Sequence, residues 1–82
     1  MNGWIGREEA LPLQTVVELL GEHRVLIEHH RGITEYSRQR IQARVKYGII
    51  CVCGGDLQLC KMTADQLVIM GRIDSLTLFR GD

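Results

Sequence analysis

From residue 16 onwards, apolar positions come in short runs that glycines or polar clusters interrupt every few residues. This punctuation is typical of strands joined by tight turns, because an amphipathic helix needs a longer stretch with a period of 3.6. The candidate strands are VVELL, RVLIEHH, ITEY, RIQARVKY, IICVC, LQLCKM, LVIMGRI and SLTLF. We therefore predict an all-β fold, a small antiparallel meander of about seven or eight short strands closing into a sandwich or barrel.

Alternation is clearest in residues 41–47, where polar residues separate Ile41, Ala43, Val45 and Tyr47. Successive side chains of a strand point to opposite faces, so one face of this strand is apolar and the other is wet. The strand therefore fixes which face of its neighbours belongs to the core.

Dipeptides with glycine, or with aspartate and serine, predict two-residue hairpin turns at residues 31–32, 47–48, 54–55 and 74–75. The first turn would bring Ile27 opposite Tyr36. The next two would pair core residues, namely Val45 with Ile50, Ala43 with Val52, Val52 with Leu57 and Ile50 with Leu59. On the reverse face they would pair Arg44 with Cys51, Cys51 with Gln58 and Ile49 with Cys60.

Local signals also stand out at residues 63–71 and at the N-terminus. Thr63, followed three residues later by Gln66, resembles a capping box and could start one helical turn. Gly71 interrupts an apolar strand face and indicates a bulge or the close approach of another backbone. Residues 1–14 contain the only proline and show no sustained period. We expect an N-terminal arm at residues 1–14 and a single β domain at residues 15–82.

Length and charge limit the class of protein. A chain of 82 residues forms one domain with a thin core, so we expect a homo-oligomer or a partner. No apolar run approaches the roughly 20 residues of a membrane span, and no signal peptide is evident, which predicts a cytoplasmic protein. Ten basic and ten acidic residues cancel, but residues 23–46 hold six basic and two acidic ones. The predicted basic surface comprises Arg31, Arg38, Arg40, Arg44 and Lys46.

That basic segment, residues 24–46, supports an alternative function as a small RNA-binding β-barrel domain. Zero net charge and the presence of only one Trp and one Phe argue against nucleic acid. If this segment binds no ligand, its basic side chains simply form a solvated face of the sheet.

Three thiols lie within ten residues, at Cys51, Cys53 and Cys60. Zinc knuckles commonly use C-x2-C, whereas two thiols of C-x-C in a strand lie about 6.6 Å apart along the backbone. We therefore predict no metal, no cofactor and, in the absence of any catalytic motif, no enzyme activity. The apolar reverse face carries Ile49 with these thiols, and either a second packed sheet or an interface with a partner or another subunit would cover it.

The order of several segments resembles the YabP/YqfC family of small sporulation proteins, and more closely its YqfC branch. These segments are IEHHRGI at residues 27–33, Tyr36-Ser37, the alternating strand ending in Gly48, LQL, and LVIMGRIDSLTL with Gly71. The resemblance runs from roughly Leu11 to Phe79 and carries no catalytic signature. The thiols are not part of the shared pattern, and the resemblance assigns no binding residue.

The resemblance implies a protein of endospore-forming bacteria that is made in the mother cell and needed for spore development. It implies no enzyme activity, and it implies association with a YqfD-like, membrane-anchored protein. We accordingly expect a non-enzymatic protein-interaction module, peripheral at the inner face of a membrane in the mother cell.

Overall fold

The computed structural model describes residues 15–81, and in these residues every regular element is a strand. The strands are β1 (Val16–Leu20), β2 (Arg24–Glu28), β3 (Ile33–Tyr36), β4 (Arg40–Val45), β5 (Gly48–Met62) and β6 (Gln66–Arg80). They form one antiparallel sheet in the order β1-β2-β6-β5-β4-β3. The predicted all-β antiparallel fold is confirmed, while the predicted arm at residues 1–14 lies outside the described residues.

Six strands form where eight short ones were expected, because β5 and β6 each span two predicted strands. The turns predicted at residues 54–55 and 74–75 are wrong, since both positions lie inside the long strands: Gly54 lies opposite Ile73 and Cys53 opposite Ser75. The cross-strand pairs expected from the first of these turns are wrong as well. Cys51 pairs with Gln42 and Thr77, and Ile49 pairs with Arg44 and Phe79.

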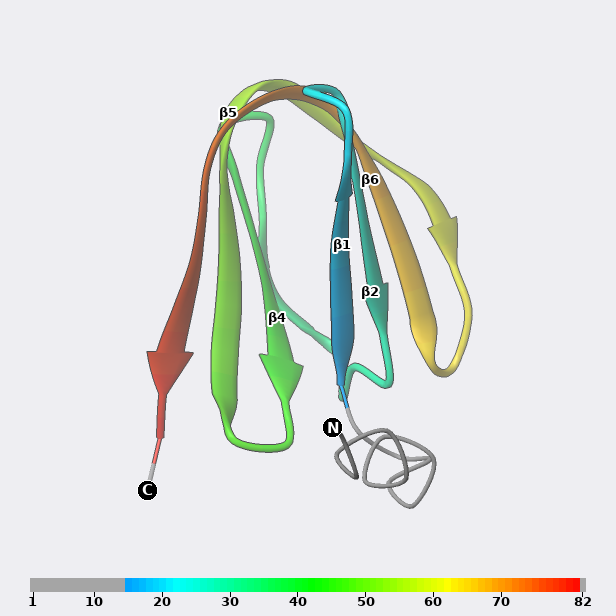
Figure 1. Ribbon diagram of the computed structural model, residues 1–82, viewed down its shortest axis with the longest axis vertical. Coiled ribbons are helices and arrows are strands. Elements are labelled where there is room, and N and C mark those ends of the chain that lie inside the picture. The colour runs from blue at the N-terminus through cyan, green and yellow to red at the C-terminus, as the bar shows by residue number, and fades with distance from the viewer. Residues whose placement is uncertain (1–14, 82) are drawn as a thin grey trace, which may run out of the picture.

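β5 and β6 bend together at their middle, so that the single sheet folds over itself like an arch (Figure 1). At the bend, Asp56 and Leu57 both lie opposite Gly71, which is the two-against-one pattern of a β-bulge. Gly71 has a φ of 138°, and a Cβ there would lie 2.6 Å from the carbonyl oxygen of Asp56. A Cβ on Gly54 would overlap the carbonyl oxygen of Arg72. The bulge or close approach predicted at Gly71 is confirmed.

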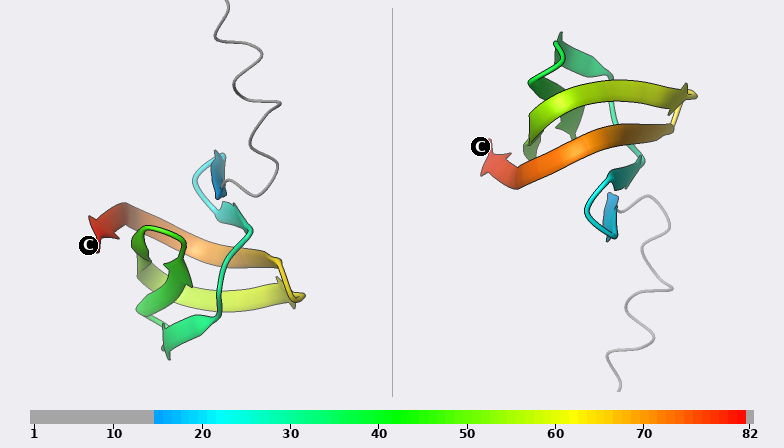
Figure 2. Two further views of the ribbon diagram at one scale, coloured as in Figure 1. Left: turned by 90° about the horizontal axis from the view of Figure 1, so that it is seen from below. Right: turned by 90° about the horizontal axis from the view of Figure 1, so that it is seen from above.

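The bend divides the sheet into two layers (Figure 2). The first half-sheet consists of β3, β4, residues 48–53 of β5 and residues 73–80 of β6, and the second of β1, β2 and the remaining parts of β5 and β6. Ten buried side chains form the core: Val25, Ile27, Ile41, Ala43, Val45, Ile50, Val52, Leu57, Leu67 and Ile69. The sheet is compatible with a sandwich but does not close into a barrel, because the edge strands β1 and β3 do not pair with each other.

The hairpin predicted at residues 31–32 is wrong, since β2 pairs with β6 and β3 pairs with β4. Residues 29–32 instead cross from one half-sheet to the other. The amide of His29 donates to the carbonyl of Asp65 in the turn before β6, and the amide of Arg31 donates to the carbonyl of Arg44 in β4, at 2.6 Å. A glycine that looks like a hairpin turn, Gly32, is therefore part of a crossover between layers.

Two further turns differ in detail from the expectation. β4 and β5 join at Lys46-Tyr47, one residue earlier than predicted, so Ala43 lies opposite Ile50. This two-residue change of register preserves the apolar face, because side chains alternate with a period of two. No helical turn begins at Thr63. Its hydroxyl accepts from the amide of Gln66 at 3.0 Å within the turn joining β5 and β6.

Candidate interaction surfaces

A pair of thiols lies on the outer face of the first half-sheet, away from the core. The sulfur atoms of Cys51 and Cys53 are 3.5 Å apart, which their shared strand face explains. The guanidinium Nε of Arg40 donates to the sulfur of Cys51 at 3.4 Å, and the amide of Gln42 approaches the same sulfur at 3.8 Å. We call these four residues the thiol patch.

The thiol patch keeps the sulfur of Cys53 protonated at neutral pH. The thiol–thiol hydrogen bond with Cys51, followed by burial, raises the pKa of Cys53. The hydrogen bond to Cys51 likewise raises the pKa of Arg40, which stays charged. A thiol with a raised pKa is a weak nucleophile, since the thiolate is the reactive form. The geometry therefore favours packing over chemistry at this patch.

The predicted interface residues do not form a single surface. Ile49, Cys51 and Cys53 share the outer face of the first half-sheet. Cys51 is only 2% exposed, because side chains of its own sheet surround it and Arg40 contacts its sulfur. Cys60 lies beyond the bend, in the second half-sheet, as the extra residue of a bulge between Leu59 and Lys61. In residues 15–81, no second sheet packs on this outer face.

The predicted basic surface also divides. Arg31, Arg44 and Lys46 lie together at the end of the first half-sheet that is far from the bend, where they line one hollow. Arg40 lies over the thiol patch. Arg38 lies close to the bend, where its carbonyl accepts from the amide of Leu57 at 2.8 Å.

Arg80, which the sequence pattern does not single out, lies with these three cations at the end of the sheet far from the bend. The pairing of Gly48 with Arg80 brings the end of β6 to the β4–β5 turn. We call the set Arg31, Arg44, Lys46 and Arg80, with the neighbouring rings of Tyr47 and Phe79, the basic end. Only the β5–β6 pairing could have revealed it, because 34 residues separate Lys46 from Arg80 in the sequence.

In the part of the chain that the structure describes, residues 15–81, strand edges are also free on one side. β2 pairs only with residues 66–70 of β6, so residues 73–80 have a partner strand on one side alone, and β1 forms the outer edge of the other half-sheet. Leu19 of β1 and Leu78 of β6 share the inner face with core residues, yet they are 53% and 45% exposed. The core is therefore open along this side, which the sequence pattern did not predict.

At the crossover, the titratable side chain of His30 is buried. Its Nδ1 accepts from the amide of Gly32 at 2.9 Å, so Nε2 carries the proton and donates to the carbonyl of Thr63 at 3.0 Å. Both ring nitrogens are thus used in holding the layers together.

In residues 15–81, no group of three or more His, Cys, Asp or Glu side chains is placed to hold a metal ion. Nor does that range contain a helix with the length and apolar character to cross a membrane.

These features define a small antiparallel β domain with a folded sheet, open strand edges and a cationic end. The model of the YabP family matches residues 13–81, and the chain belongs to this family. The uncharacterized protein YqfC of Bacillus subtilis (strain 168) is 23% identical over 79 residues, which cover 90% of this chain and 85% of that protein. The predicted family and its YqfC branch are therefore confirmed. No solved structure matches the chain.

Proposed function

We propose that the protein is a non-enzymatic interaction module of a sporulation assembly, and that it binds a membrane-anchored, YqfD-like partner in the mother cell. Membership of the YabP family supports the link to sporulation. The open side of the core supports the interaction, because Leu19 and Leu78 lie on the core face and are about half exposed. Exposed strand edges with apolar side chains are templates for added strands.

The direction of the backbone groups at the free edge of β6 carries the proposal. The amide of Gly81 donates to the carbonyl of Tyr47 at 2.8 Å, which marks a hydrogen-bonded pair between β5 and β6. Such pairs alternate along an antiparallel ladder, so Leu76 and Leu78 direct their amide and carbonyl groups away from β5. An extended segment of the partner can bind these groups as an added strand, and its apolar side chains can cover Leu78.

Affinity capture of the co-expressed membrane partner tests this proposal. Leu78→Lys places a charge on the open core face at the free edge, and we expect it to abolish capture. Thr77→Lys is the matched control, because Thr77 is exposed on the opposite face of the same strand. Thermal melting followed by circular dichroism checks that both variants fold. Equal capture by wild type and the Leu78 variant would refute binding at this edge.

A second copy of the chain is the other candidate for the free edge. Size-exclusion chromatography with light scattering identifies this case, since a dimer that Leu78→Lys dissociates and Thr77→Lys does not would replace the membrane partner at this edge. Deletion in the source organism tests the role itself. A normal yield of spores would defeat the link to sporulation, even if the capture experiment succeeded.

A further inference from the structure

An open hollow of about 730 Å³ lies at the basic end, where the β4–β5 turn meets the end of β6. Four of the ten lysine and arginine residues of the chain line it, and none of its ten lining residues is acidic. The structure assigns no ion pair to these four cations among residues 15–81. Their positive charge is therefore available to a ligand.

Backbone contacts hold segments that are distant in the sequence around this hollow. The amide of Arg31 donates to the carbonyl of Arg44 at 2.6 Å, and the amide of Arg44 donates to the carbonyl of Gly32 at 2.8 Å. Gly48 allows β5 and β6 to approach closely, because a Cβ there would overlap the carbonyl oxygen of Phe79. Arg44 and Arg80 are thus mounted on paired strands and Lys46 on a short turn, while Arg31 lies on the crossover that these hydrogen bonds attach to β4.

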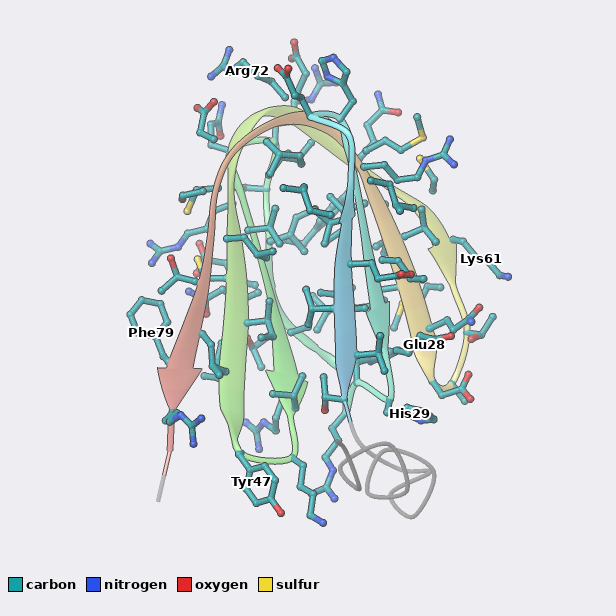
Figure 3. All side chains as sticks on the ribbon, in the orientation of Figure 1. Glu28, His29, Tyr47, Lys61, Arg72 and Phe79 are labelled. Atoms are coloured by element: carbon teal, nitrogen blue, oxygen red, sulfur yellow. The ribbon has the colours of Figure 1, made fainter. Side chains whose placement is uncertain are left out.

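Aromatic side chains flank the cations and face the solvent. Tyr47 projects from the turn and Phe79 projects outward from β6 (Figure 3), and they are 65% and 53% exposed. The ammonium of Lys46 lies 5.2 Å from the centre of the Tyr47 ring. Exposed rings beside lysines and arginines are typical of membrane–water interfaces, where the rings enter the headgroup layer and the cations bind lipid phosphates.

We propose that the basic end binds the phosphate groups of an anionic phospholipid surface, with Tyr47 and Phe79 in the headgroup layer. Four cations without an ion pair among residues 15–81 match several phosphates presented side by side, and the open shape of the hollow suits a surface better than an enclosed small molecule. This contact uses side chains at the end of the sheet, whereas the contact proposed above for the protein partner uses the backbone edge at Leu76 and Leu78. It can be measured with the purified chain alone.

Co-sedimentation with lipid vesicles tests the proposal. We expect retention on vesicles of phosphatidylcholine mixed with phosphatidylglycerol, no retention on phosphatidylcholine alone, and release by added salt. Arg44→Gln combined with Lys46→Gln should weaken retention about thirty-fold, because each cation near such a surface strengthens binding by a factor of about five to six. Arg38→Gln combined with Lys61→Gln removes the same charge from exposed positions elsewhere and should change retention much less.

The remaining outcomes overturn the proposal. Equal losses in the two double variants would mean that net charge alone attracts the protein. Equal retention on both kinds of vesicle would exclude recognition of an anionic surface, and release by inorganic phosphate at low concentration would favour a free phosphate ligand. Retention of labelled RNA without retention on vesicles would favour nucleic acid. If the variant with Arg44→Gln and Lys46→Gln does not fold, Arg80→Gln on the neighbouring strand β6 provides the same test. Tyr47→Ser tests whether the ring of Tyr47 contributes to retention.

Discussion

Gly71 is the position at which the bend can be tested most directly. Its φ of 138° disfavours any residue with a Cβ, and the strain of such a conformation costs about 1–3 kcal/mol. A Cβ would in addition lie 2.6 Å from the carbonyl oxygen of Asp56 and 2.9 Å from the Cα of Leu57. Both neighbours are backbone atoms of the facing strand, so the contact is relieved only if β5 and β6 move apart.

We therefore expect Gly71→Ala to lower the free energy of unfolding by about 3–5 kcal/mol, as strain and disrupted packing add. Small domains have total stabilities at the low end of roughly 5–15 kcal/mol, so this loss is a large share. The melting temperature should fall by at least about 12 °C, at about 4 °C or more for each kcal/mol in a domain of this size.

Gly21→Ala is the matched control for this experiment. Gly21 also has a positive φ, of 69°, but nothing lies within 4 Å of the position that its Cβ would take. Its replacement should cost only the conformational term, about 1–2 kcal/mol. Urea titration followed by circular dichroism measures both variants. Equal losses in the two variants would refute the claim that the close approach of the strands at the bend limits the residue to glycine.

Further predictions concern the thiols and the core at the bend. A thiol reagent should modify exposed Cys60 first, Cys53 more slowly and buried Cys51 only as the protein unfolds, which mass spectrometry of the modified chain can follow. Because its pKa is raised in the folded state, Cys53 contributes stability below the ordinary thiol pKa, and this contribution is lost as the pH rises through the raised value. Urea titrations at neutral and alkaline pH measure this loss, and equal stability at the two pH values would contradict it. Leu57→Ala, at a position 1% exposed, should cost about 2–5 kcal/mol in the same titration, and a loss below 1 kcal/mol would mean that the bend is not a packed part of the core.

The sequence pattern predicts the strands and the core face well, because alternation depends only on which side chains are buried. Ile41, Ala43, Val45, Ile50, Val52 and Leu57 are buried core residues, although all four of their expected pairings are wrong. A pair such as Gly54-Gly55 fits a hairpin turn and a bend in a long strand equally well, since both need the same backbone freedom. What decides between them is the facing strand, which the local sequence does not reveal.

The same limit explains the surfaces. The three thiols were predicted to face away from the core, and Cys51 and Cys53 do lie on the outer face; the burial of Cys51 depends on the long side chain of Arg40, which alternation does not describe. Arg31, Arg44 and Lys46 were recognised as basic but not as part of one hollow. Their grouping depends on the return of β6 to the β4–β5 turn, a contact between distant parts of the chain.

The pairing of β2 with β6 has a consequence for the newly made chain. Val25 and Ile27 are fully buried in the finished protein, but one of the two strand segments beside them, residues 66–70, comes about 40 residues later in the chain. These side chains stay exposed until most of the chain has been synthesised, which takes seconds at about 5–20 residues per second. The core therefore assembles only after translation of β6, because its contacts join segments that are far apart in the sequence.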